Sequence, residues 1–171
     1  MMATRIFGSP IDIACARGSG DEWICVAQSP PTAIPIVRNS QPIDTTRPFI
    51  FSIDGIPVGY IQYWFIGHHQ NETWIKDHPW LGELPAETVG VDLSIGVPGL
   101  LSQGIGSAAL RAFVEGLRDE GHGTIVIDPD PENKRAVRAY MKAGFRPVPE
   151  LVGRTGDVLI MQYDPNANEI S

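Results

Sequence analysis

The chain has 171 residues, of which 43% are hydrophobic and 19% charged, and its net charge is −7 with neutral histidines. This length and composition are typical of one folded domain, and the negative charge argues against nucleic-acid binding and favours a basic partner. With two cysteines and no His or Cys at zinc spacing, the sequence excludes a disulfide framework and predicts no metal site.

Residues 1–47 contain so many glycines and prolines that a long helix is excluded. Short strands are predicted at residues 22–27 and 33–37. The N-terminus has no apolar segment long enough for a secretory signal, and no stretch approaches the roughly 18 apolar residues of a membrane helix. We therefore expect a cytoplasmic protein.

Beyond residue 48 the sequence predicts a β-hairpin. Strand 49–53, the turn residues Asp54 and Gly55, and strand 58–66 follow one another. Residues 67–88 are polar and aromatic, and they predict a long loop with at most one helical turn, a common location for substrate binding.

From residue 89 onward strands and helices alternate, which indicates an α/β layer. Strand 91–97 leads into a glycine turn and helix 107–120, whose apolar residues recur at spacings of three and four and predict one stripe packed on the sheet. The stripe consists of Ala109, Leu110, Phe113, Val114 and Leu117.

The last third predicts a strand, a capped helix and a final strand. Strand 124–128 is followed by Asp130 as helix N-cap and Pro131 at the first helical position. The helix should end at about residue 143, with Gly144 as its C-cap. Strand 158–163 and a polar tail complete the chain.

Residues 103–107 read Gln-Gly-Ile-Gly-Ser between a predicted strand and a helix. Glycines lack Cβ atoms, so a phosphate can approach the backbone amides and the positive end of the helix. The same glycines would also suit a plain turn. Because the third Rossmann glycine and the Gly-Lys-Ser/Thr of a P-loop are missing, acetyl-coenzyme A is the remaining common pyrophosphate ligand.

Residues 103–145, together with Gly-Val-Asp-Leu-Ser-Ile-Gly at 90–96, resemble the GNAT N-acetyltransferases, and most of all the aminoglycoside 6'-N-acetyltransferases. The resemblance covers about residues 48–163. It implies an α/β (α+β) GNAT fold with a mixed, largely antiparallel central sheet flanked by helices. We expect one domain over 1–171, comprising a divergent segment 1–47, this core and a tail 164–171. Leu101 departs from the family, which has Gln or Arg there.

The resemblance also implies site residues. Asp92 matches the residue that holds and deprotonates the attacking amine, and Tyr140 matches the proton donor beside the thioester sulfur. Asn133 lies two helical turns before Tyr140, on the same face, and matches the asparagine that binds the pantetheine arm. A strand or turn carboxylate and a core aromatic are the structural alternatives for the first two. The implied cofactor-binding residues are Ile95, Val97, Gln103, Gly104, Ile105, Gly106, Ser107, Asn133, Ala136 and Tyr140.

For the acceptor, the family's Asp-Pro position falls on Asp128, where it contacts amino groups of the aminocyclitol; a helix-capping carboxylate is the alternative. Carboxylates and aromatic rings in the 67–88 loop suit a polycationic sugar, and Trp80 and Glu83 are predicted to bind it, although a solvated acidic loop has the same composition. The histidines form no metal or triad pattern and are assigned to the surface or to packing: His68, His69, His78 and His122.

The free-energy costs of proton transfer restrict the roles of Asp92 and Tyr140. Moving a proton from an ammonium near pKa 9 to a carboxylate near 4 costs about 7 kcal/mol, so Asp92 first binds and orients the amine, and acts as a base only with a raised pKa or with water. Transfer from a tyrosine to the departing thiolate is uphill by roughly 2 kcal/mol, so a strong hydrogen bond suffices.

The sequence thus predicts an acetyl-coenzyme A-dependent transferase that acetylates the 6'-amine of an aminoglycoside by direct attack. A siderophore-type or other small-amine N-acetyltransferase and a non-catalytic acyl-coenzyme A- or aminoglycoside-binding domain are the alternatives. We expect a monomer or homodimer without nucleic-acid or membrane partners. The accepted aminoglycosides and the role of residues 1–47 stay open.

Overall fold

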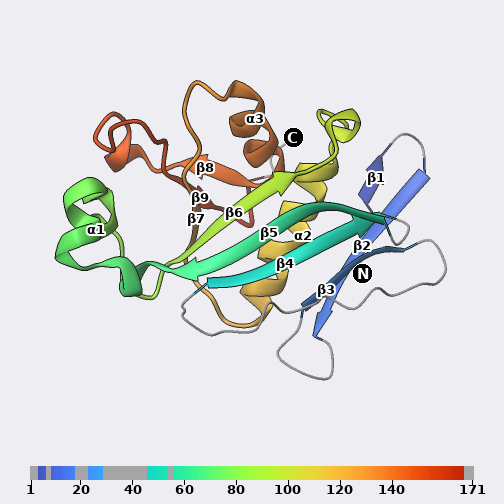
Figure 1. Ribbon diagram of the computed structural model, residues 1–171, viewed down its shortest axis with the longest axis horizontal. Coiled ribbons are helices and arrows are strands. Elements are labelled where there is room, and N and C mark those ends of the chain that lie inside the picture. Colours follow the sequence, from blue (N-terminus) through green and yellow to red (C-terminus); the bar gives the residue numbers. More distant parts are fainter. Residues whose placement is uncertain (1–3, 7–8, 18–22, 29–45, 54–55, 168–171) are drawn as a thin grey trace.

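The computed structural model describes residues 4–6, 9–17, 23–28, 46–53 and 56–167, whose strands form one nine-stranded sheet (Figure 1). The order is β1-β2-β3-β4-β5-β6-β7-β9-β8. Pairing is antiparallel except between β3 and β4 and between β6 and β7, so the sheet is mixed and largely antiparallel, as predicted. The strands are β1 (Thr4–Ile6), β2 (Ser9–Arg17), β3 (Trp23–Gln28), β4 (Thr46–Ile53), β5 (Ile56–Phe65), β6 (Val89–Ile95), β7 (Ile125–Ile127), β8 (Phe145–Pro147) and β9 (Met161–Tyr163).

Several strand predictions are confirmed and others are corrected. β3 matches the predicted strand 22–27, and β4 with β5 forms the predicted hairpin. The strands β1, β2 and β8 were not predicted, and β9 is shorter than 158–163. A three-residue strand such as β8 is too short for its alternation to be recognised in sequence. The predicted strand 33–37 lies outside the described residues.

Strands β5, β6 and β7 frame the site. Antiparallel pairing of β5 with β6 places Gln62 opposite Asp92 and Trp64 opposite Gly90. The parallel pairing of β6 with β7 comprises Val89 with Ile125 and Gly90 with Val126. Asp92 therefore lies two residues beyond the last pair, where β6 continues without β7 beside it.

Helix α2 (Ile105–Asp119) lies behind β4 and β5 in the view of Figure 1 and packs on the sheet. The predicted stripe is confirmed, because all five of its side chains are buried. The ring of Phe113 meets that of Phe49 edge to face, with centroids 5.3 Å apart. Each such large apolar side chain contributes about 1.5–3 kcal/mol on burial, which holds α2 against the sheet.

Helix α3 (Lys134–Ala143) begins later than predicted. The Oδ1 atom of Asn133 accepts a hydrogen bond from the amide of Ala136 at 3.1 Å, so Asn133 is the N-cap. Asp130 instead accepts from the amide of Glu132 at 2.7 Å and closes a turn before the helix. Gly144 is the C-cap as predicted, with a φ of 106°.

Residues 67–88 are more helical than predicted. The side chain of Asn71 caps a short helix, and Pro79 begins another. The side-chain amide of Gln70 donates to the carbonyls of Leu81 and Leu84 at 2.8 and 2.7 Å, which ties the segment into a compact unit. Such long-range bonds leave no local signal in the sequence. The short helices of the described chain are η1 (Ile66–His69), α1 (Glu72–Asp77), η2 (Pro79–Glu83), η3 (Pro98–Leu100) and η4 (Pro149–Leu151).

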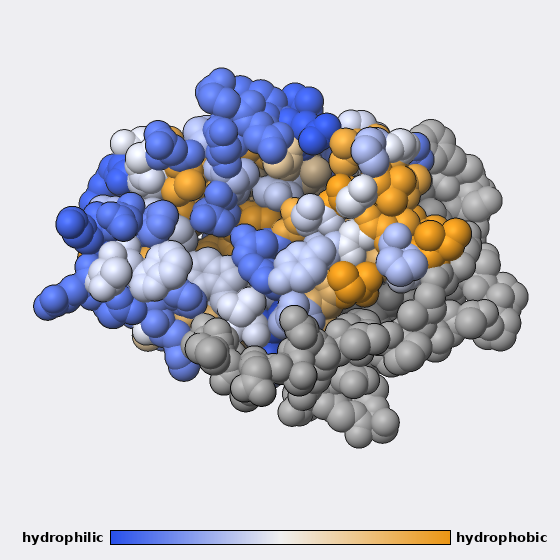
Figure 2. All heavy atoms as spheres, viewed as in Figure 1, coloured by the Kyte–Doolittle hydropathy of each residue, from blue (hydrophilic) through white to orange (hydrophobic). Residues whose placement is uncertain are grey.

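The hydropathy of the surface differs between the two ends of the face that Figure 2 shows. Figure 2 shows hydrophilic residues over α3 and around α1, and hydrophobic residues over the end of β6 and the loop that follows. Among the helices in the described ranges, none combines the length and apolar character needed to cross a bilayer.

Candidate active site

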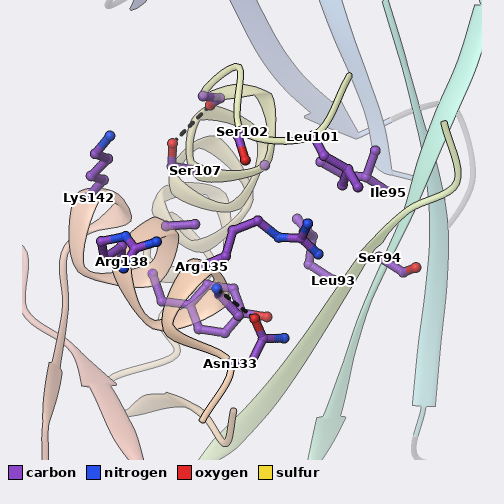
Figure 3. Close-up of a pocket in the computed structure, with 15 residues that line it drawn as sticks. Leu93, Ser94, Ile95, Leu101, Ser102, Ser107, Asn133, Arg135, Arg138 and Lys142 are labelled. Carbon is purple, nitrogen blue, oxygen red and sulfur yellow. Dashed lines mark hydrogen bonds between the residues drawn. The ribbon is translucent and has the colours of Figure 1, made fainter. Parts of the chain in front are cut away.

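A cavity of about 390 Å³ lies between β6, the start of α2 and one face of α3, and is called here the α2–α3 cavity (Figure 3). Three β6 residues form one side, and six residues of α3 form the other. Its lining residues are Leu93, Ser94, Ile95, Leu101, Ser102, Gly104, Gly106, Ser107, Asn133, Arg135, Ala136, Arg138, Ala139, Tyr140 and Lys142.

The start of α2 offers unpaired amides to this cavity. The first hydrogen bond of the helix ladder runs from the amide of Ala108 to the carbonyl of Gly104 at 3.0 Å. The amides of residues 105–107 therefore precede the ladder, and their partial positive charge suits an anion. Gly104 caps the helix with a φ of 83°, a backbone conformation that favours glycine. At Gly106 a Cβ would lie 3.2 Å from Cδ1 of Ile95, so glycine allows α2 to approach β6.

Three predicted cofactor residues do not line the α2–α3 cavity with their side chains. Val97 lies beyond the end of β6 and is 38% exposed, whereas Ile105 is buried in the core. The side chain of Gln103 donates to the carbonyl of Gly99 at 2.6 Å and so holds the loop. The other predicted cofactor residues line the cavity: Ile95, Gly104, Gly106, Ser107, Asn133, Ala136 and Tyr140.

Three basic residues of α3 line the same cavity and were not predicted. Arg135, Arg138 and Lys142 follow one another at spacings of three and four, so they share a face of the helix (Figure 3). That spacing was visible in the sequence, but a solvated basic face has the same pattern. Three cations opposite unpaired amides make this cavity suited to a polyphosphate ligand.

A second cavity of about 240 Å³ contains both predicted carboxylates, Asp92 and Asp128, and is called here the β5–β6 cavity. Trp74, Trp80 and Leu81 of the 67–88 segment lie over it. Of the predicted acceptor residues, Glu83 is absent from the lining, because it is exposed and its Oε1 lies 3.7 Å from Nη2 of Arg154. The lining residues are Thr46, Gln62, Trp64, His69, Trp74, His78, Trp80, Leu81, Asp92 and Asp128.

The Asp92 carboxylate is fixed by two donors from β5. Its Oδ2 atom accepts from Nε2 of Gln62 at 2.7 Å and from Nε1 of Trp64 at 3.1 Å. Tyr60 donates its hydroxyl to Oε1 of Gln62, which orients that amide. Both donors are brought to Asp92 by the register of β5 against β6, which a sequence pattern does not reveal. Among the described residues, no hydrogen bond is made to the Oδ1 atom of Asp92.

Burial and mutual repulsion change the ionisation of this site. Burial, followed by the neighbouring Asp92 charge, raises the pKa of Asp128 to about 7, against the opposing effect of its own backbone amide. Burial, and then the charges of Asp92 and Asp128, raise the pKa of the Tyr140 phenol. Tyr140 lines the α2–α3 cavity yet senses both carboxylates of the β5–β6 cavity, so it lies where the two cavities approach each other.

The shifted pKa of Asp128 predicts a pH-dependent cost to stability. The unfolded carboxyl has a pKa near 3.9, below the folded value of about 7, so this group makes the fold less stable as pH rises from about 4 to 7. We expect Asp128→Asn to gain stability relative to the wild type by up to about 3 kcal/mol between pH 5 and pH 8. Urea unfolding at both pH values measures this difference. The exposed Asp119→Asn variant is the control. If the free energy of unfolding of Asp128→Asn differs from that of the wild type by the same amount at pH 5 and at pH 8, the raised pKa of Asp128 is contradicted.

The fold and these two adjacent cavities define an acyltransferase domain of the GNAT type, and the chain belongs to that family. The family model for the acetyltransferase (GNAT) domain matches residues 35–152. The match begins before the 48–163 segment on which the sequence resemblance rests, so it includes part of the divergent N-terminal segment.

Aminoglycoside acetyltransferases are among the proteins similar to this chain. Aminoglycoside N(6')-acetyltransferase type 1 of Klebsiella pneumoniae is 30% identical over 129 residues, which are 72% of this chain and 61% of that protein. The chain thus spans less than two thirds of this relative. The crystal structure of aminoglycoside acetyltransferase AAC(6')-Ib with coenzyme A and kanamycin is 30% identical, with a TM-score of 0.58 over 73% of this chain and 70% of that chain. The same enzyme has been solved with acetyl-coenzyme A.

Proposed function

We propose that this protein transfers the acetyl group of acetyl-coenzyme A to the 6'-amine of an aminoglycoside, and thereby confers resistance to that antibiotic. The observation that carries the proposal is the pair of adjacent cavities, one with unpaired amides and cations and the other with two carboxylates. The relatives with this activity support the same substrates.

The α2–α3 cavity fits acetyl-coenzyme A. Its pyrophosphate would meet the amides at residues 105–107 and the cations of α3, and its pantetheine arm would run along β6 beside Asn133. These are the chemical groups that such a nucleotide thioester needs. Among the described residues there is no cluster of three or more His, Cys, Asp or Glu side chains suited to a metal ion.

The β5–β6 cavity fits a polycationic amino sugar. Asp92 and Asp128 supply negative charge, and Trp74 and Trp80 supply apolar surface for sugar C–H groups. Asp92 holds the reacting amine, which gives one proton to water and then attacks the thioester carbonyl. A second proton leaves the nitrogen as the amide forms, and it balances the proton that the released thiolate takes up from water. The C–N bond forms, the C–S bond breaks, and the Tyr140 hydroxyl stabilises the departing thiolate.

The raised pKa of Tyr140 favours hydrogen bonding over complete proton transfer. A phenol whose pKa lies above the usual 10 is a weaker acid, so giving its proton to a thiolate, whose conjugate thiol has a pKa of about 8.5, becomes still less favourable. We infer that Tyr140 remains protonated and donates to the sulfur.

Because acetyl-coenzyme A is a cytoplasmic metabolite, we place the protein in the cytoplasm, as a monomer or homodimer without a nucleic-acid or membrane partner.

The release of free thiol from acetyl-coenzyme A tests the proposal. We expect turnover with kanamycin to exceed the rate without acceptor by at least about 100-fold, with the product acetylated at the 6'-amine by mass spectrometry and NMR. Preferred turnover of a hydroxylysine-type amine would instead select a small-amine acetyltransferase. Binding of both ligands without thiol release would select a non-catalytic binding domain.

A further inference from the structure

His69 lies in the β5–β6 cavity, although its sequence context predicts only a surface or packing residue. It ends the short helix η1, which directly follows β5. The same cavity contains Asp92, the residue that holds the reacting amine in the proposed function. His69 is therefore placed to contact the acceptor rather than the coenzyme.

The imidazole ring is held on three sides. Its Nδ1 atom lies 3.2 Å from the carbonyl oxygen of Phe65. The indole of Trp64 approaches at a centroid distance of 4.9 Å and an interplanar angle of 75°, and that of Trp74 at 5.0 Å and 84°. These edge-to-face contacts restrict the ring to one orientation.

This orientation determines which ring nitrogen can meet a ligand. A carbonyl oxygen only accepts hydrogen bonds, so Nδ1 must carry the hydrogen that binds Phe65. In the neutral ring the Nε2 atom then has a lone pair and accepts hydrogen bonds. Within the described ranges Nε2 has no protein partner, and it is not among the buried polar atoms that lack one, so solvent or a ligand reaches it.

The neighbouring polar groups extend this pattern. The donors of Gln62 and Trp64 are used by Asp92, and the amide oxygen of Gln62 is used by Tyr60. Asp92 and Asp128 accept hydrogen bonds when ionised. Asp92, Asp128 and Nε2 of His69 can each accept a hydrogen bond, which suits a ligand with several N–H and O–H donors, such as an amino sugar. Thr46, Trp74 and Trp80 line the same cavity and carry donors that can meet the oxygen atoms of such a ligand.

We propose that Nε2 of His69 accepts a hydrogen bond from a hydroxyl or amino group of the amino-sugar acceptor, away from the reacting amine, and so selects among acceptors. This role rests on the proposed acetyltransferase function. It requires no proton transfer, because His69 binds the acceptor and Asp92 orients the reacting amine.

Steady-state kinetics with kanamycin and acetyl-coenzyme A test the proposal. His69→Phe keeps a ring between the two indoles but removes both nitrogens, and it should raise the KM for kanamycin by about 3- to 10-fold. The kcat and the KM for acetyl-coenzyme A should stay within about 2-fold. His69→Gln carries an amide oxygen near the position of Nε2 and should recover most of the lost affinity.

His68→Phe is the matched control, since the exposed His68 is adjacent in sequence and outside both cavities. Thermal unfolding verifies that each variant is folded; if His69→Phe is not, His69→Leu takes its place. An unchanged KM for kanamycin, or an equal rise in the Phe or Leu and Gln variants, would overturn the role of His69. Absence of thiol release by the wild type with kanamycin would instead overturn the acetyltransferase function.

Discussion

Replacing Asp92 with asparagine is expected to lower kcat/KM for kanamycin by at least about 100-fold, the order of loss that follows from a misplaced reacting group. The substitution keeps the size of the side chain but removes the charge that holds the amine. Gln62 and Trp64 donate to one carboxylate oxygen of Asp92, at 2.7 and 3.1 Å, and in the asparagine variant an uncharged amide oxygen has to accept both bonds. Thiol-release kinetics under saturating acetyl-coenzyme A measure the loss.

The loss should be specific to the acceptor side. Asp92 does not line the α2–α3 cavity, so the affinity for acetyl-coenzyme A, measured by calorimetry, should change less than about 3-fold. Asp119→Asn removes an equal charge from the exposed end of α2 and should retain full activity. Full turnover by Asp92→Asn would show that another group activates the amine.

Tyr140→Phe is expected to lower kcat by about 10- to 100-fold without a comparable change in either KM. The phenol has its effect when the thiolate leaves, so its removal affects the transition state more than the binding of substrates. Because burial and both carboxylates raise its pKa, the wild-type hydroxyl stays protonated through the neutral range. Ionisation of this residue should therefore not lower the wild-type kcat in the neutral range.

Pre-steady-state and steady-state kinetics between pH 6 and pH 10 provide the measurement. Tyr163→Phe is a suitable control, because Tyr163 is also a buried tyrosine but lies in the core outside both cavities. If Tyr140→Phe has the wild-type kcat, the leaving thiolate is stabilised elsewhere, and the cations of the α2–α3 cavity become the next candidates.

Local sequence patterns predicted the helices that line the α2–α3 cavity. The stripe of α2 and the glycine cap at Gly144 depend on residues within one or two helical turns, so their spacing contains the information. The start of α3 was misplaced because both Asp130 and Asn133 are good caps, and the choice between them depends on the turn formed by residues 130–133.

The residues that line the β5–β6 cavity were less predictable from the sequence. Glu83 and Trp80 have similar sequence surroundings, yet the first faces Arg154 and the second lines the β5–β6 cavity. His69 gave no signal, since the cavity that it lines also takes residues from β4, β5, β6 and the segment after β7, which are distant in sequence. The path of residues 66–84 over the sheet brings these groups together, and long-range contacts such as those of Gln70 determine that path.

The sequence by itself determined the family, the glycine-rich start of α2 and the candidate residues Asp92, Asn133 and Tyr140, because each depends on a short motif. The tertiary structure alone decided the surroundings of those residues. Strand register gives Asp92 its two donors, and burial beside Asp92 raises the pKa of Asp128 to about 7. Spacing within an element is encoded locally, whereas register, burial and electrostatic coupling arise only when distant segments pack against one another.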